Sequence, residues 1–82
     1  MVEAQVPPAV RRLLTELFVD WLEGRRSSRV ELAVRLGVDE EYVGGLSERA
    51  QQRGLVQSLP HGYELTEAGR KAITIVFQSP PS

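Results

Sequence analysis

The sequence predicts one mainly α-helical domain that contains a small β-hairpin. Apolar residues recur at intervals of three and four along successive segments, as on the buried face of an amphipathic helix. Residues that favour the starts and ends of helices flank these segments. A short extended stretch around the turn-forming residues Pro60-His61-Gly62 follows them, which predicts the hairpin.

The first helix is expected over residues 8–23. Pro8 suits a first helical turn, where backbone donors lack partners in any case, and Gly24 suits the position just after a helix. The apolar positions are Val10, Leu13, Leu14, Leu17, Phe18, Trp21 and Leu22. The solvent-exposed face is expected to carry Arg11, Arg12, Glu16, Asp20 and Glu23.

The second helix is expected over residues 29–36. Ser28 and Glu31 have the spacing of a capping box, in which each side chain accepts a hydrogen bond from a backbone amide at the helix start. Gly37 ends the helix, because glycine adopts the positive φ of a tight helix terminus. The inward residues are Leu32, Ala33 and Leu36.

The third helix is expected over residues 40–53, with Asp39 as its cap and Gly54 after its end. Its inward residues are Val43, Leu46 and Ala50. The pair Gly44-Gly45 lies inside this helix, where each glycine costs about 1 kcal/mol relative to alanine. Either another group approaches the backbone at this pair, or the helix is locally soft.

The hairpin is expected over residues 55–66, and Thr66 can cap a fourth helix over residues 67–77. The apolar spacing in residues 72–77 fits a helix or a strand, and we favour the helix. The domain therefore spans residues 8–77, with flexible tails at residues 1–7 and 78–82.

Composition excludes several classes of protein. The chain has 82 residues, no cysteine and a formal net charge of −1, so it is neither a disulfide-stabilised module nor a polycation that binds nucleic acid by charge alone. Every apolar run is shorter than the roughly 20 residues that span a bilayer, so a cytoplasmic protein without membrane contact is expected. The chain has no nucleophile paired with a histidine base and no phosphate-binding glycine loop, so neither an enzyme nor a cofactor-binding protein is expected. His61 is the only histidine and cannot complete a metal site alone.

Several motifs resemble the winged-helix family. Ala33 is small where two helices would cross and Gly37 makes the turn between them, within the helix-turn-helix pattern Leu32-Ala33-x-x-Leu36-Gly37-Val38-x-x-x-x-Val43-x-x-Leu46. The segments after the third helix are similar to the wing and post-wing segments of transcriptional regulators of the multiple-antibiotic-resistance and phenolic-acid-repressor types. These segments are Arg53-Gly54-Leu55-Val56 and Tyr63-Glu64-Leu65-Thr66-Glu67-Ala68-Gly69-Arg70. The resemblance covers about residues 9–73.

The resemblance implies a transcriptional regulator that binds duplex DNA. In this family the third helix enters the major groove, while the wing and the start of the second helix contact phosphates. The residues that correspond are Arg25, Arg26, Ser27, Ser28 and Arg29 for phosphates, Tyr42, Ser47 and Arg49 from the third helix, and His61 from the wing.

The distribution of charge departs from the family's pattern. Residues 25–35 carry four arginines and one glutamate, whereas residues 39–49 carry four carboxylates and one arginine. Carboxylates are repelled by phosphates, which opposes the reading of bases by the third helix. Arg35 is expected to be solvated or to pair with Glu31. The alternative function is therefore a winged-helix protein-interaction module whose acidic third helix or apolar terminal helices dock a partner protein.

The aromatic residues Phe18, Trp21 and Phe77 are expected in the core. Winged-helix regulators of the resembled types commonly dimerise through their terminal helices. A homodimer formed by the first and fourth helices is therefore expected.

Overall fold

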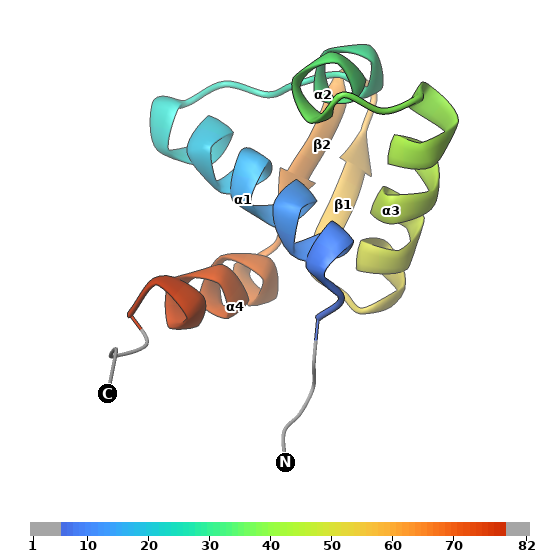
Figure 1. The fold of residues 1–82 in the computed structure, drawn as a ribbon. Coiled ribbons are helices and arrows are strands. Elements are labelled where there is room, and N and C mark those ends of the chain that lie inside the picture. The colour runs from blue at the N-terminus through green and yellow to red at the C-terminus, as the bar shows by residue number, and fades with distance from the viewer. Residues whose placement is uncertain (1–5, 79–82) are drawn as a thin grey trace.

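The computed structural model describes residues 6–78 of the chain. Three helices, α1 (Pro8–Glu23), α2 (Arg29–Leu36) and α3 (Glu40–Gln52), come first. An antiparallel hairpin of β1 (Val56–Leu59) and β2 (Gly62–Leu65) follows, and α4 (Glu67–Gln78) ends the domain (Figure 1). The topology is winged-helix-like, and we refer to the hairpin as the wing. The predicted fold class is confirmed, and so is the helical assignment of residues 72–77.

Most of the predicted helix ends are confirmed by their capping contacts. Glu31 N donates to Ser28 Oγ over 3.2 Å and Ser28 N donates to Glu31 Oε1 over 2.8 Å, which completes the capping box of α2. Thr66 Oγ1 accepts a hydrogen bond from Gly69 N at 3.0 Å. Asp39 occupies the capping position of α3, but its side chain makes no capping hydrogen bond, so that contact was predicted wrongly.

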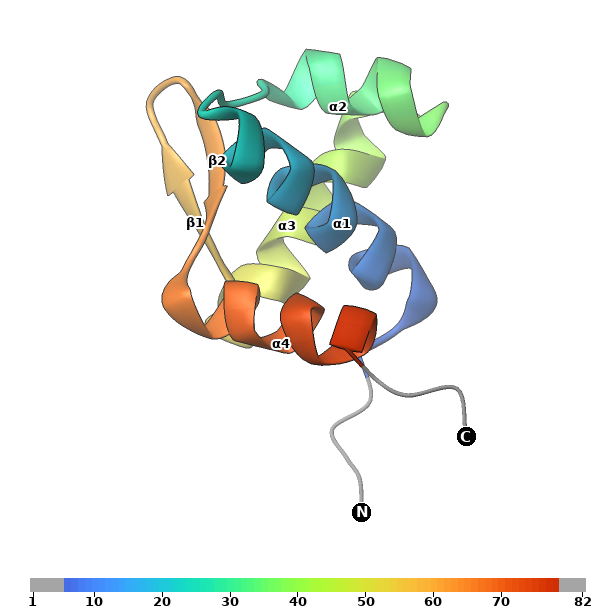
Figure 2. The same ribbon diagram turned by 90° about the vertical axis from the view of Figure 1, so that its left-hand side faces the viewer.

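The core is built around α1. Helices α2, α3 and α4 and strand β2 all pack against α1, which lies in the middle of these elements in Figure 2. The largest fully buried apolar side chains come from five of these elements and are Val10, Leu13, Leu14, Leu17, Leu32, Val43, Leu65 and Ile73. A core assembled on one central helix leaves the start of α2, the outer face of α3 and the wing at the surface.

The last turn of α1 differs from its prediction. Asp20, expected at the surface, is only 2% exposed, whereas Trp21 and Leu22 are 46% and 63% exposed. The buried face of α1 continues from Leu17 to position 20 because that position faces the loop between α1 and α2, which supplies polar partners. Phe18 is partly buried against the core, so Trp21 is the aromatic residue placed wrongly. The side chain of Phe77 lies outside the described residues.

The wing is fixed to the loop between α1 and α2. Strands β1 and β2 pair from Val56 opposite Leu65 to Leu59 opposite Gly62. Tyr63 also forms an isolated bridge to Ser27, and Gly62 lies so close to the Ser27 carbonyl that any β-carbon would overlap it. The start of α2 and the tip of the wing therefore lie side by side.

None of the helices within residues 6–78 is long and apolar enough to cross a membrane. The flexible tails predicted at residues 1–7 and 78–82 fall largely outside the described residues. Of the described positions, Val6 packs partly buried against the core, and Gln78 belongs to α4.

Candidate functional site

The start of α2 and the wing enclose a shallow depression of about 310 Å³. Three of the sequence-predicted DNA contacts, Ser28, Arg29 and His61, lie around this depression. His61 is exposed at the turn of the wing, between Pro60 and Gly62. The fold thus brings together residues separated by more than 30 positions in the sequence.

Arg29 is the central cation of this surface. Its Nε donates a hydrogen bond of 3.1 Å to Tyr63 Oη, and this bond raises the pKa of Arg29 above its ordinary value. Its guanidinium lies across α3 at Gly44, where a β-carbon would stand 3.2 Å from Arg29 Cζ. Arg29 makes no ion pair with a carboxylate among the side chains that the structure describes. It is therefore an oriented, exposed cation without a salt-bridge partner among the described side chains.

The Arg29 side chain packs against Gly44, where an added β-carbon would require the guanidinium to shift by a few tenths of an ångström. Of the two explanations for the glycine pair, approach of another group holds for Gly44, because the Arg29 side chain lies directly over it. No atom lies within 4 Å of the position that a β-carbon would take at Gly45. Only one of the two glycines is thus explained by packing within the chain.

A buried carboxylate organises the loop that precedes α2. Asp20 Oδ2 accepts a hydrogen bond of 2.6 Å from Ser27 Oγ, and Asp20 Oδ1 accepts one of 3.0 Å from Arg25 Nε. Arg35 donates to both oxygens over 3.3 Å. Burial opposes ionisation of Asp20, but the hydrogen bonds from Ser27, Arg35 and Arg25 outweigh it, so the pKa of Asp20 lies below its ordinary value.

This cluster corrects two predictions. Ser27 is buried and its hydroxyl donates to Asp20, so it is not available as a phosphate contact. Arg35 was expected to be solvated or to pair with Glu31, and both expectations are wrong. It reaches across to α1, where its Nε lies 3.1 Å from Glu16 Oε1 and its guanidinium also pairs with Asp20. Both side chains join α1 to the segment that follows it.

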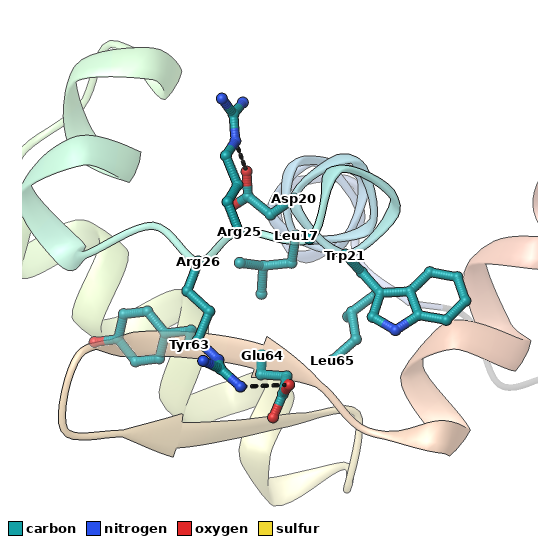
Figure 3. Close-up of a pocket in the computed structure, with 9 residues that line it drawn as sticks. Leu17, Asp20, Trp21, Arg25, Arg26, Tyr63, Glu64 and Leu65 are labelled. Atoms are coloured by element: carbon teal, nitrogen blue, oxygen red, sulfur yellow. Dashed lines mark hydrogen bonds and ion pairs between the residues drawn. The ribbon is translucent and has the colours of Figure 1, made fainter.

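Arg25 and Arg26 point away from each other (Figure 3). Arg25 pairs with Asp20 and, over 3.1 Å, with Glu23, while Arg26 reaches Glu64 on β2 over 3.2 Å. Both arginine side chains are about half exposed. Exposed ion pairs of this kind contribute about 0–1 kcal/mol, so a phosphate can compete with Glu23 or Glu64 for these guanidinium groups.

The outer face of α3 is acidic. Tyr42 and Arg49 are exposed there as predicted, but Ser47 is buried and its hydroxyl donates to Gly44 O over 2.9 Å, so it is not a DNA contact. A groove of about 420 Å³ between α3 and the wing is lined by Arg29 together with Glu41 and Glu48. Four exposed carboxylates at the start and on the outer face of α3 make no ion pair with any described side chain: Asp39, Glu40, Glu41 and Glu48.

A cavity of about 250 Å³ lies between the end of α1 and β2 (Figure 3). Trp21 stands at its edge, with its ring stacked on Phe18 and 4.9 Å from Arg70 Cζ. The charged groups that line it are those of Asp20, Arg25, Arg26 and Glu64, and all four are already paired. Within the described residues no three side chains of histidine, cysteine, aspartate or glutamate gather as metal ligands would.

Comparison with known proteins finds no matching family model and no matching curated protein. The winged-helix-like topology and the geometry of the surface residues are therefore the features that bear on function.

The roles of two residues in and beside the candidate site were not predicted from the sequence. The sequence motif places Tyr63 only in the wing, but the Tyr63 hydroxyl orients Arg29 and its backbone joins the wing to Ser27. Its charge predicts Asp20 at the surface, but Asp20 is buried. Its position continues the spacing of Val10, Leu13 and Leu17, and this spacing is the sequence signal that indicates burial.

Proposed function

We propose that the protein binds duplex DNA through the phosphate backbone, with the start of α2 and the wing as the contact surface. The observation that carries the proposal is Arg29, a cation oriented by Tyr63 that makes no ion pair with any described carboxylate. Phosphate contacts from arginines supply most of the sequence-independent affinity of DNA-binding proteins. Regulation of transcription is the role that the family resemblance suggests for such binding.

The remaining contacts follow from exposure and charge. Arg26 and Arg25 join Arg29 by exchanging their exposed ion pairs for phosphates, and Ser28 and His61 border the same depression. Helix α3 does not read bases in this proposal, because Glu41 and Glu48 lie on the face that would enter the groove. Binding is therefore expected to depend strongly on salt and weakly on sequence.

The test is the affinity for a labelled arbitrary duplex, measured by fluorescence anisotropy over a series of salt concentrations. The slope of log K against log salt should be about −0.9 for each phosphate contacted, and Arg29→Ala should make it less steep by about one unit. Arg12→Ala is the matched control, because Arg12 is an exposed arginine near the start of α1, the end remote from the loop before α2. It should leave the slope unchanged.

Tyr63→Phe refines this test. It keeps the charge of Arg29 but removes the hydrogen bond that orients it, so affinity should fall while the salt slope changes little. Absence of binding at low salt would reject the proposed function. Equal slopes for Arg29→Ala and Arg12→Ala would reject the assigned surface.

A second candidate function is a protein-interaction module that uses the outer face of α3. The specific observation is that the carboxylates of Glu41 and Glu48 are exposed and pair with no described cation. Such a face suits a basic partner by electrostatic complementarity. Glu41→Gln with Glu48→Gln should then weaken association with a basic protein, while leaving DNA affinity equal or higher.

We also propose a homodimer through α1 and α4. The support is the exposure of Trp21 and Leu22 at the end of α1, of which Trp21 lies against the α4 residue Arg70. Light scattering should give twice the chain mass of 9.1 kDa at micromolar concentration, and Leu22→Glu should return it to the chain mass. A monomer at high micromolar concentration would exclude the dimer.

A further inference from the structure

The outward side of α2 carries an apolar groove that no other described part of the chain covers. Val30 and Val34 are 51% and 76% exposed and stand four positions apart, so they share one face of the helix. Together with Ala33, Gly37 and Val38 they line an open groove of about 480 Å³ between α2 and the start of α3. We call it the α2 groove.

The helix itself does not require these valines. Branched residues are less favourable than leucine, glutamate or lysine in a helix, and an apolar side chain gains nothing in water. The buried residues of α2 that join it to the core are Leu32, Ala33 and Leu36. Val30 and Val34 are thus exposed apolar residues without a role in the packing of the domain.

The charges around the α2 groove all have one sign. Asp39 and Glu40 line it, both are exposed, and neither pairs with a described cation. The arginines of α2 face other directions, since Arg29 lies over Gly44 of α3 and Arg35 reaches Glu16 and Asp20 of α1. No cation lines the groove, which makes it unsuited to a phosphate backbone.

We propose that the α2 groove binds an amphipathic helix of a partner protein. Apolar side chains of that helix, spaced by three and four residues, cover Val30 and Val34, and its lysines or arginines face Asp39 and Glu40. The residues that line the α2 groove are all different from those around Arg29 and His61. This binding therefore does not depend on DNA binding, and it uses a different face from the Glu41–Glu48 face of α3.

The experiment is a titration of the isotope-labelled full chain, followed by amide chemical shifts. The probe is a synthetic helical peptide with leucines spaced by three and four residues and lysines between them. Two control peptides have the same composition in scrambled order, or glutamate in place of lysine. The largest shifts are expected at Val30, Val34, Gly37 and Val38, and the peptide with lysines in register should bind at least tenfold more tightly than either control.

Variants make the test specific to the groove. Val34→Lys, which removes an apolar contact and adds a repelling charge, should weaken binding at least tenfold, and Asp39→Asn with Glu40→Gln should weaken it and reduce its salt dependence. Val19→Lys is the matched control, because Val19 is an exposed valine on α1 outside the groove. Circular dichroism of each variant establishes that it is folded.

Four outcomes would overturn the inference. They are absence of shifts at millimolar peptide, equal loss of binding in Val34→Lys and Val19→Lys, equal affinity of the scrambled peptide, and shifts centred on Glu41 and Glu48. The last result would support the second candidate function, which uses the Glu41–Glu48 face, and would reject the α2 groove as the binding site.

Discussion

At the scale of single residues, Asp20 links three parts of the chain: α1, the loop after it and α2. Its carboxylate is buried at the end of α1 and accepts hydrogen bonds from Ser27, Arg25 and Arg35, which belong to the loop and to α2. A buried charge is favourable only when it is paired and hydrogen-bonded, and here all these donors come from outside α1. One side chain thus links α1 to both the loop and α2, in addition to the Arg35–Glu16 ion pair and the apolar packing of the two helices.

Asp20→Asn is expected to destabilise the fold by about 2 kcal/mol, because it weakens several hydrogen bonds to a charged group. Urea unfolding followed by circular dichroism measures this change. Glu23→Gln is the control, since the exposed pair of Glu23 with Arg25 should contribute less than about 1 kcal/mol. Equal losses in the two variants would show that burial of Asp20 has no energetic consequence.

The same carboxylate makes the free energy of unfolding depend on pH. The pKa of Asp20 is lower in the folded chain than in the unfolded chain, so the unfolded state takes up a proton first as pH falls. Its contribution is present above the unfolded pKa of about 4 and is lost as pH falls further, through the folded pKa. Unfolding free energies from pH 7 to pH 2 should fall less steeply in Asp20→Asn than in the natural chain.

At the scale of elements, Gly69 of α4 and Gly45 of α3 differ in what surrounds them. In α4, a β-carbon at Gly69 would overlap the Leu55 carbonyl, so this helix passes the start of the hairpin at backbone distance. In α3, no atom lies within 4 Å of a β-carbon at Gly45. Glycine is required by close packing in the first case and by nothing within the described chain in the second.

Alanine substitutions should therefore have opposite signs in these helices. Gly45→Ala should stabilise the protein by up to about 1 kcal/mol through helix propensity. Gly69→Ala should destabilise it by about 1–3 kcal/mol, because α4 must move away from Leu55. Thermal and urea unfolding of both variants provide the comparison, and stabilisation by Gly69→Ala would contradict the packing described for α4.

The local structure of these elements was largely predictable from sequence, whereas the candidate site was predictable only in part. Ser28, Gly24 and Gly37 act within one turn of their own position, so the helix ends could be located from them. Arg26 and Arg29 depend on Glu64 and Tyr63, which stand more than 30 residues away. Partners this far apart in the sequence cannot be recognised from it. Residues 25–35 therefore appear more basic in the sequence than in the fold, where Asp20 and Glu64 pair with Arg25 and Arg26.

At the scale of the whole molecule, one central helix joins every layer. Helix α1 contacts α2, α3, α4 and β2, so none of these elements has a core of its own. A domain of this size buries only a little over 60% of the surface of its unfolded chain, which leaves a small margin of stability. A substitution that weakens the packing of any one element on α1 should therefore lower the free energy of unfolding of the whole domain.

Unfolding should accordingly be a single cooperative transition. Trp21 is the only tryptophan, and its ring lies between Phe18 on the same helix and Arg70 on α4. Fluorescence of Trp21 and far-ultraviolet circular dichroism should give the same midpoint in urea. An earlier fluorescence transition would instead mean that α4 separates from α1 before the rest of the domain unfolds.

The close approach of Gly62 to Ser27 has a consequence for how the wing meets a ligand. A two-stranded hairpin is marginally stable alone, but here its tip is held to the neighbouring loop by backbone contact. The distance between the backbone at His61 and at Arg29 is therefore fixed before a ligand binds. The wing loses little conformational entropy on binding for this reason. Ligands whose two contact points match that span are favoured over those that would need the wing to open.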